Sequence, residues 1–392
     1  MKKIGLCICY NVHNYGSVLQ ALATVKIIEQ LGYEYEIIGY IKKRSIFYYI
    51  KKAPLLLSKT FYYVLKRKIS IIKQARKSNE YKANLRLRKK IFNEFSKEHF
   101  VENVKKYIGY SELKRGSSNY YAIIVGSDQL WNPMGFSTNF YNLMFVKDEV
   151  KKISYATSFG ISHIPIFYRT KARKFISRID HLSVREIEAK NIIAQLVPRK
   201  KVFVAADPTL LFNREQWEVL IPQKNEVIDE YIFCYFLGTS LESRNAANEL
   251  SDYLGLKIVT IKHEDEYFAP DDSFGDYSPN GLSPNDFVNY IRNAKYILTD
   301  SYHGTIFSII NHKKFLTFYR FKQNDKNSRN SRIDSLLNIL GLQNRLFTQE
   351  SNVRTIMEEI NYDEIDKRVN VFRNESIDFL KDALENCEKD HD

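Results

Sequence analysis

The stretch "KIGLCICYNVHNYGSVLQALATVKIIEQLGYEYEIIGY", residues 3–40, carries the pattern that decides the fold. Residues 3–10 are β-prone, residues 17–32 place apolar side chains with helical spacing and end at Gly32, and residues 34–40 are β-prone again. The polar run at 11–17 predicts the loop before the helix. A strand, a helix and a second strand in this order favour two parallel strands joined by a right-handed crossover. The stretch therefore predicts an α/β protein.

The rest of the chain repeats this alternation of strands and helices. Further strands are predicted at 120–125, 151–161, 201–207, 231–238, 256–261, 296–300 and 314–319, and helices near 165–178, 186–196, 241–254, 284–293, 304–311 and 331–340. Because 392 residues exceed one ordinary core, we expect two Rossmann-like domains that face a cleft. We place the first domain at 1–178, the second at 179–345, and a helical tail at 346–392 that packs back on the first domain.

Composition narrows the class of protein. Hydrophobic residues make up 44% of the chain, which argues against bulk disorder. No apolar run approaches the ~20 residues of a membrane-spanning helix, and the start of the chain does not match a secretory signal. The cysteines Cys7, Cys9, Cys234 and Cys387 lack zinc-site spacing and are expected to be small core residues. These features predict a cytoplasmic protein.

The net charge of +13 is concentrated in one segment. Residues 42–100 contain 18 Lys or Arg, three Glu and no Asp, a surplus of 15 that leaves the remainder near neutral. The segment is predicted to be a helical insertion in the first domain. Its basic clusters alternate with aromatic residues, a pattern typical of an anionic membrane interface. A solvated helical hairpin is the next alternative, and a nucleic-acid site is the third. We expect the membrane surface as its partner and no nucleic acid.

Histidine 303 interrupts an apolar pattern in "LTDSYHGTIFSII", residues 298–310. The strand at 296–300 ends there and a helix begins, so Ser301, Tyr302 and His303 lie at a carboxyl strand end, where open α/β sheets bind ligands. The N-terminus of the helix suits a phosphate or carboxylate group, and a histidine acts as acid or base near neutral pH. A helix cap with a polar surface histidine explains the same residues equally well.

Five segments in register resemble the polysaccharide pyruvyl transferase family: "HNYGSVLQAL", "IIVGSDQLWNP", "LSVRE", "ADPTLL" and "NAKYILTDSYHGTIFSIINHKKFLTF". The resemblance runs from about residue 3 to about residue 345. It implies a GT-B-like fold and transfer of a pyruvyl group from phosphoenolpyruvate to a sugar of a cell-surface polysaccharide precursor, forming a ketal. It also implies that phosphoenolpyruvate is a co-substrate and that no cofactor and no metal take part.

The resemblance implies a donor site in the second domain, with His303 as the catalytic residue. Better-known members have an arginine two residues before this histidine, where this chain has Ser301. A missing guanidinium removes a fork of donors for phosphate or carboxylate, so other cations must replace it or the donor differs. The expected donor-binding residues are Arg185, Ser301, Tyr302, Gly304, Arg320, Lys322 and Arg332. For the cations, a solvated surface charge is the alternative.

The first domain offers polar side chains for an acceptor sugar. They follow its first strand and the strand at 120–125, and comprise Asn14, Tyr15, Gly16, Ser17, Gln20, Ser127 and Gln129, with Asp128 to orient or deprotonate a hydroxyl. The dinucleotide fingerprint is absent, because the first loop has one glycine. A capped turn with a packed Trp131 would explain the second group. Asp207 is read as a turn former, with contact to the cleft as the weaker alternative.

Two other functions remain open from the sequence. A glycosyltransferase that uses a nucleotide sugar would keep the fold and fit the serine at position 301. A non-catalytic, membrane-associated scaffold in polysaccharide assembly would bind through 42–100. The sequence contains no metal-binding motif.

Overall fold

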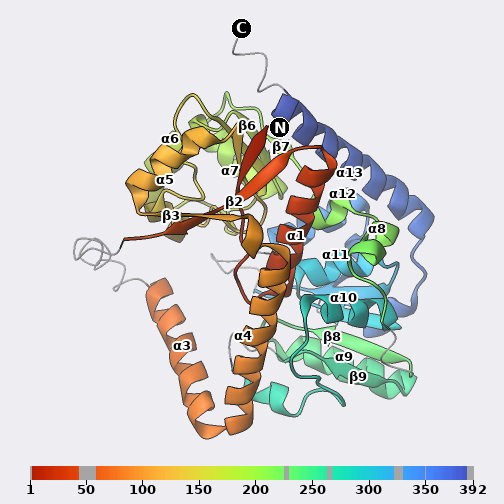
Figure 1. Ribbon diagram of the computed structural model, residues 1–392. Helices are drawn as coiled ribbons and strands as arrows, with labels where there is room; N and C mark the ends of the chain where they lie inside the picture. The colour runs from red at the N-terminus through yellow and green to blue at the C-terminus, as the bar shows by residue number, and fades with distance from the viewer. Residues whose placement is uncertain are drawn as a thin grey trace.

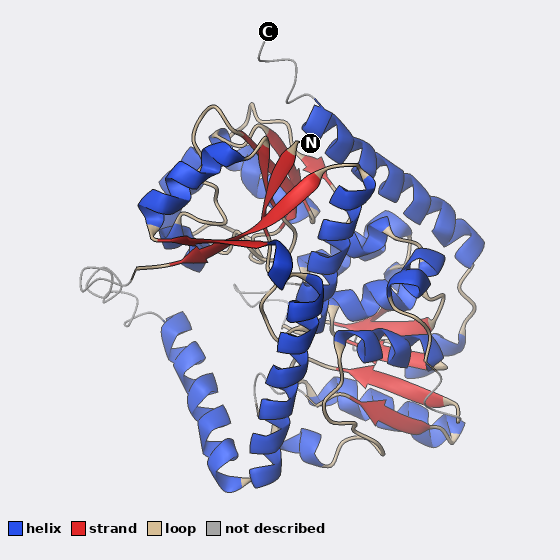
Figure 2. Ribbon diagram, viewed as in Figure 1, coloured by secondary structure: helices blue, strands red, loops and turns tan. Residues whose placement is uncertain are grey.

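The computed structural model describes residues 2–43, 59–224, 229–262, 267–321, 330–348 and 350–385. Two separate sheets form two lobes, with helices on both faces of each sheet (Figure 1, Figure 2). The first has the order β3-β2-β1-β4-β5-β6-β7. Its strands are β1 (Lys3–Cys7), β2 (Glu34–Ile41), β3 (Val104–Ile108), β4 (Ala122–Val125), β5 (Lys151–Thr157), β6 (His181–Val184) and β7 (Phe203–Val204).

The central strands β1, β4, β5 and β6 of the first sheet are buried along most of their length, whereas the edge strand β3 exposes Lys105 and Lys106. Ile4 and Leu6 of β1 belong to the core shared with α1 (Tyr15–Gln30), whereas Cys7 belongs to the core on the other face. Helices α5 (Tyr110–Gly116), α6 (Ile166–Ser177) and α7 (Ile187–Leu196) contribute to that second core. All pairings between the named strands are parallel, which requires such crossover helices.

The second sheet has the order β12-β11-β10-β8-β9 and is also parallel. Its strands are β8 (Tyr231–Tyr235), β9 (Lys257–Thr260), β10 (Tyr296–Thr299), β11 (Lys314–Phe318) and β12 (Leu346–Phe347). The helices of this lobe are α9 (Leu241–Leu254), α10 (Pro284–Asn293), α11 (Tyr302–Ile310) and α12 (Ser331–Leu340). This parallel sheet with its helices forms the second Rossmann-like lobe that the sequence predicts.

The expected domain boundary at residue 179 is wrong. Strand β6 pairs with β5, and β7 pairs with β6, so both strands belong to the first sheet, which ends at Val204. The second sheet begins at Tyr231 and continues past residue 345 to Phe347. Between the sheets, the chain passes through α8 (Arg214–Leu220). Strand and helix alternate in the same way in both lobes, so the pattern alone does not mark where one sheet stops.

The helical insertion and the tail connect the lobes. Helices α3 (Lys59–Lys77) and α4 (Asn79–His99) form a hairpin, and the part of the insertion at 44–58 lies outside the described residues. Helix α13 (Tyr362–Glu385) contacts the second lobe, where the Tyr362 hydroxyl donates to Lys313 O, and the first lobe, where Ser376 Oγ accepts from Ala206 N at 2.8 Å. In the described part of the chain, no helix has both the length and the apolar character needed to cross a membrane.

Candidate active site

The candidate site lies between the lobes, where carboxyl strand ends of both sheets meet. Ser127 and Asp128 follow β4, Arg185 follows β6, and Asp207 follows β7 in the first lobe. His303 lies in the first turn of α11, after β10 of the second lobe. An added Cβ on Gly16, in the first turn of α1, would lie 2.0 Å from His303 Nδ1, so the imidazole packs directly on that backbone. The glycine is required by this approach of the second lobe.

Asp207 is the centre of the cluster. Its Oδ2 accepts from Arg185 Nη1 at 2.8 Å and from Ser127 Oγ at 2.9 Å, and lies 3.5 Å from His303 Nε2. Burial by itself would raise the pKa of Asp207, but His303 and Arg185 outweigh it and hold the pKa well below the usual range. Asp207 is therefore an anion at neutral pH, suited to orient an imidazole and to stabilise its protonated form.

Arg185 is fully buried and contacts two carboxylates. Besides the bond to Asp207, its Nη2 lies 3.8 Å from Asp128 Oδ1, and its guanidinium carbon lies 4.6 Å from the centre of the Tyr302 ring. Burial disfavours its charge, but Asp207 overcomes this effect and the pKa is raised. Nε and Nη2 are buried without a hydrogen-bond partner among the described residues. The guanidinium thus retains donor capacity beside the histidine, although its main contacts are within the protein.

Asp128 has the strained backbone of a site residue, with φ of 81°. Its Oδ2 accepts from Ser17 Oγ at 2.6 Å and its Oδ1 from Gln129 N at 2.8 Å. Burial would raise its pKa, but Arg185 and Ser17 lower it on balance. A carboxylate with a lowered pKa is a weak base, so Asp128 is better suited to orient a hydroxyl than to deprotonate it.

The remaining cations gather around Tyr302. The guanidinium carbon of Arg332 lies 5.6 Å from the centre of this ring, and burial together with repulsion from Arg185 and Arg320 lowers the pKa of Arg332 to about 9. Arg320 Nη2 donates to Asp300 O at 3.2 Å. Lys322, also expected here, lies outside the described residues. Burial is the largest cause of this lowered pKa and the neighbouring arginines add to it, so an anionic ligand would stabilise the charged guanidinium.

The turn before α11 caps the N-terminus of that helix. Ser301 Oγ accepts from Gly304 N at 3.2 Å, which caps α11 and occupies a backbone donor expected for the ligand. Asp300 accepts from Leu237 N and Gly238 N and thereby joins the ends of β10 and β8. Ser301 and Gly304 therefore position His303 within the first helical turn.

The acceptor residues expected in the first lobe divide into two groups. Ser17, Ser127 and Asp128 lie within the cluster around Arg185. Asn14 Oδ1 caps α1 by accepting from Ser17 N, and Gln20 Nε2 donates to Ser17 O, so these side chains support the helix. Tyr15 stacks on Phe287 of the second lobe with ring centres 4.9 Å apart.

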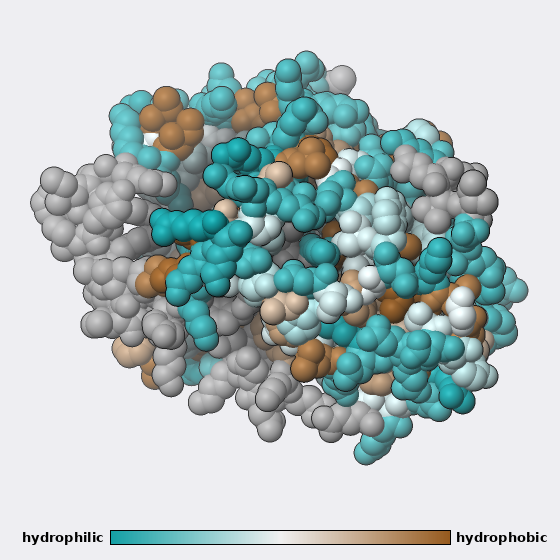
Figure 3. All heavy atoms as spheres, turned by 90° about the horizontal axis from the view of Figure 1, so that it is seen from below, coloured by the Kyte–Doolittle hydropathy of each residue, from teal (hydrophilic) through white to brown (hydrophobic). Residues whose placement is uncertain are grey.

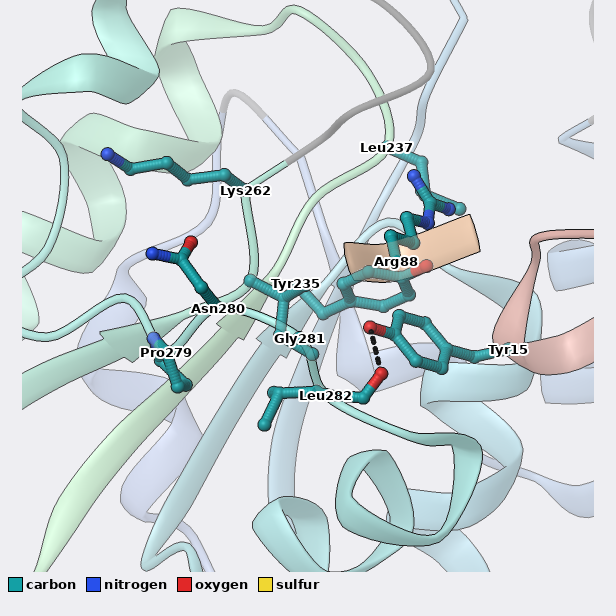
Figure 4. Close-up of a pocket in the computed structure, with 10 residues that line it drawn as sticks. Tyr15, Arg88, Tyr235, Leu237, Lys262, Pro279, Asn280, Gly281 and Leu282 are labelled. Atoms are coloured by element: carbon teal, nitrogen blue, oxygen red, sulfur yellow. Dashed lines mark hydrogen bonds between the residues drawn. The ribbon is translucent and has the colours of Figure 1, made fainter. Parts of the chain in front are cut away.

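A pocket lies beside this cluster, between α4, α1 and the ends of β8 and β9 (Figure 4). The Tyr15 hydroxyl donates to Leu282 O at 3.2 Å on one wall, and Arg88 of α4 lies near the rings of Tyr15 and Tyr235. Arg88 also donates to His13 O, which holds α4 against the loop before α1. The basic insertion thus supplies a side chain to a pocket shared by both lobes.

The sequence did not assign a site role to Asp207 or Glu186. Asp207 was read as a turn former, and it does accept from Thr209 N, yet its second oxygen contacts Arg185 and Ser127. Glu186 is buried, which raises its pKa, and its Oε1 accepts from Ser158 Oγ at 2.7 Å. Placing β7 beside β6 in the first sheet would have indicated that Asp207 and Arg185 end neighbouring strands.

Architecture and site define the class as a GT-B-fold protein with its site between two Rossmann-like lobes. The UDP-N-acetylglucosamine 2-epimerase from Rickettsia bellii is similar, with a TM-score of 0.52, 9% identity, and coverage of 100% of this chain and 99% of that chain. The UDP-GlcNAc 2-epimerase from Methanocaldococcus jannaschii has a TM-score of 0.48, 13% identity, and coverage of 95% and 93%. At 9% identity, the likeness to the Rickettsia bellii enzyme shows the fold alone.

The family follows from the sequence model that matches the chain. The model for polysaccharide pyruvyl transferase matches residues 14–320, well over half of the chain, and the protein belongs to that family. This confirms the family indicated by the five segments. No curated protein matches the sequence significantly.

Proposed function

We propose that the protein transfers a pyruvyl group from phosphoenolpyruvate to two hydroxyls of a sugar in a cell-surface polysaccharide precursor. The family supports the transfer, and one structural observation carries the mechanism. His303 is held between Gly16 and the buried anion Asp207, with three arginines nearby. A proton-transfer group beside several guanidinium groups is what an enol phosphate requires.

The donor would lie at the second lobe, next to the first turn of α11. Phosphoenolpyruvate carries a phosphate and a carboxylate, and Arg332 and Arg320 are the cations proposed to bind them: Arg332 lies over the Tyr302 ring, and Arg320 lies beside Asp300, just before α11. Ser301 itself is engaged as a helix cap, so the guanidinium missing at that position would be supplied from these neighbouring elements. Arg185 would act mainly by holding Asp207 and Asp128 in place.

The reaction balances without a redox partner. His303 would deliver a proton to the methylene carbon of the enol phosphate, which leaves C2 electron-poor, and a sugar hydroxyl would add there and release its proton. Phosphate would then leave with its C–O bond electrons, and a second hydroxyl would close the cyclic ketal. Of the two hydroxyl protons, one ends on the new methyl group and the other on phosphate. A positioned acid of this kind contributes roughly 10²–10⁴-fold.

The acceptor sugar would lie against the first lobe. Ser17 and Asp128 would orient its hydroxyls, since the lowered pKa of Asp128 favours hydrogen bonding over proton abstraction. The pocket lined by Tyr15, Tyr235 and Arg88 would hold the next part of the acceptor, because a guanidinium binds a phosphate linkage.

The test is a product assay with a panel of aryl and lipid-linked glycosides. With phosphoenolpyruvate, we expect phosphate release and a ketal, identified by mass spectrometry and by the methyl signal in NMR. His303→Gln should lower kcat at least about a hundredfold, whereas the matched variant His163→Gln, at an exposed histidine, should leave it unchanged.

Two outcomes would overturn the proposal. One is the absence of phosphate release and ketal across the whole panel. The other is a thermal shift with nucleotide sugars and none with phosphoenolpyruvate, which would indicate a glycosyltransferase. A fully active His303→Gln variant would remove His303 from the mechanism.

A further inference from the structure

Helix α3 exposes an apolar stripe. Leu65, Ile69 and Ile72 are 41%, 42% and 52% exposed. Their spacing of four and three residues places them one above another on the same face of the helix. Large aliphatic side chains grouped on one face lose free energy in water, and contiguous exposure of this kind marks an interaction surface.

Basic residues flank this stripe on both sides. Lys66, Lys68, Lys73, Arg76 and Lys77 are exposed. Over its whole length, Lys59–Lys77, the helix contains seven Lys or Arg and no acidic residue. The surface therefore combines an apolar centre with a purely cationic border.

The other side of α3 faces the protein. Ser70, Ile71, Gln74 and Ala75 are half-buried, and the main contacts of α3 are with α4. Helix α4 lies between α3 and the second lobe (Figure 1). Its own attachment is firm, because Phe92 and Phe95 are buried in the main core and Leu87 contacts Gly281 of the second lobe. Thus α4 fixes α3 in position with the apolar stripe turned outward.

We propose that α3 is the membrane-binding element of the protein and lies in the headgroup region of a bilayer containing anionic lipids. The apolar stripe inserts among the acyl chains, and the flanking lysines bind lipid phosphates. The aliphatic centre argues against a nucleic-acid site, because a phosphate backbone would contact Leu and Ile side chains there, and these contribute no binding energy to phosphate. This proposal does not depend on the reaction assigned to the site.

The surface seen from below also contains apolar residues scattered among hydrophilic ones (Figure 3). Such isolated exposure is ordinary for a globular protein. Elsewhere in the described chain, Phe167 of α6 and Val219 of α8 are 93% and 82% exposed. They provide matched controls, because each is more exposed than Leu65, Ile69 or Ile72 but lies on a different helix.

The experiment is sedimentation of the full chain with vesicles of phosphatidylcholine alone or mixed with phosphatidylglycerol. We expect binding to the anionic vesicles that weakens with added salt. Ile69→Glu with Ile72→Glu, and separately Lys66→Glu with Lys73→Glu, should each lower the partition coefficient at least about tenfold. Phe167→Glu with Val219→Glu should leave it unchanged. Circular dichroism and the thermal midpoint verify that each variant is folded.

Three results would overturn the proposal. The first is an absence of vesicle binding, or equal binding to neutral and anionic vesicles. The second is binding of duplex DNA or RNA that the lysine variants abolish and the isoleucine variants do not. The third is a concentration-dependent dimer in light scattering that Ile69→Glu with Ile72→Glu dissociates, which would assign the stripe to a second copy of the chain.

Discussion

Asp207 and Arg185 form an ion pair in which neither side chain is exposed to solvent. A buried pair of this kind gains little over an apolar pair, because both charges lose their hydration. Removing one partner is costly, since the other charge stays buried without compensation. The pair is therefore better understood as holding His303, Ser127 and Asp128 in place than as a source of stability.

Asp207 should affect both the stability of the protein and the pH dependence of that stability. Asp207→Asn should lower the free energy of unfolding at pH 7 by about 3–5 kcal/mol, measured by urea titration. Because the folded pKa of Asp207 is lowered, its contribution is present above the unfolded value of about 3.9 and is lost as the pH falls below it. The variant should accordingly show a flatter decline of stability below pH 4.

The control is the double variant Arg185→Met with Asp207→Asn, which removes the buried cation as well. It should recover much of the lost stability while its kcat stays low, because the histidine has lost its anionic partner. If Asp207→Asn were as stable as the unaltered protein, Asp207 would not be needed to compensate the buried charge of Arg185.

The sequence predicted site roles for His303 and Arg185, but it did not predict that Asp207 lies between them. The motif around each residue was visible in the sequence, and the structure places both at the site. Asp207 was misread because its strand was placed in the wrong domain. A carboxylate at this strand end is explained locally by its hydrogen bond with Thr209 N. Its second role, the contact with Arg185, becomes visible only when β7 is paired with β6.

Among the elements, α11 sets the direction of His303. The helix begins at Tyr302, and Ser301 Oγ accepts from Gly304 N, which satisfies one backbone donor of its first turn. His303 lies within that turn, so its position depends on how the helix begins.

We expect Ser301→Ala to lower the free energy of unfolding by about 1 kcal/mol and also to lower kcat, because the first turn frays. Asn213→Ala removes a comparable cap from α8 and serves as the control. It should cost similar stability, measured by urea unfolding, and leave kcat unchanged. Equal kcat losses in both variants would mean that the cap at Ser301 has no special effect on the site.

The elements found in the sequence are those with strong local signals. Helix α9 ends at Leu254 before Gly255, as its pattern predicted, because a glycine with positive φ stops a helix cheaply. The two-residue strand β12 and the edge strand β3 were not predicted, since a short strand is recognised only through the strand beside it.

At the scale of the whole molecule, the two lobes share one hydrophobic core. The same cluster includes Leu6 of β1, Phe233 of β8 and Leu384 of α13. Tyr15 crosses the boundary, where it stacks on Phe287 and donates to Leu282 O. The described lobes are therefore joined by buried contacts rather than by a linker alone.

This shared core predicts a single cooperative unfolding transition in calorimetry. Tyr15→Ala should lower the free energy of unfolding by about 3–5 kcal/mol, because it leaves a cavity between the lobes. Tyr15→Phe keeps the ring and loses one hydrogen bond, so it should cost about 1 kcal/mol. Two separate transitions in the unaltered protein would contradict this interpretation.

The sequence by itself determined the α/β class, the family, the basic insertion and the histidine at a strand end, because each is written in local periodicity or in a contiguous motif. Only the tertiary structure decided where the first sheet ends, that Asp207 and Arg185 meet His303, and that the stripe on α3 faces outward. The physical reason is that hydrogen bonds between strands, ion pairs and burial join residues far apart in the chain, and no local pattern specifies such partners.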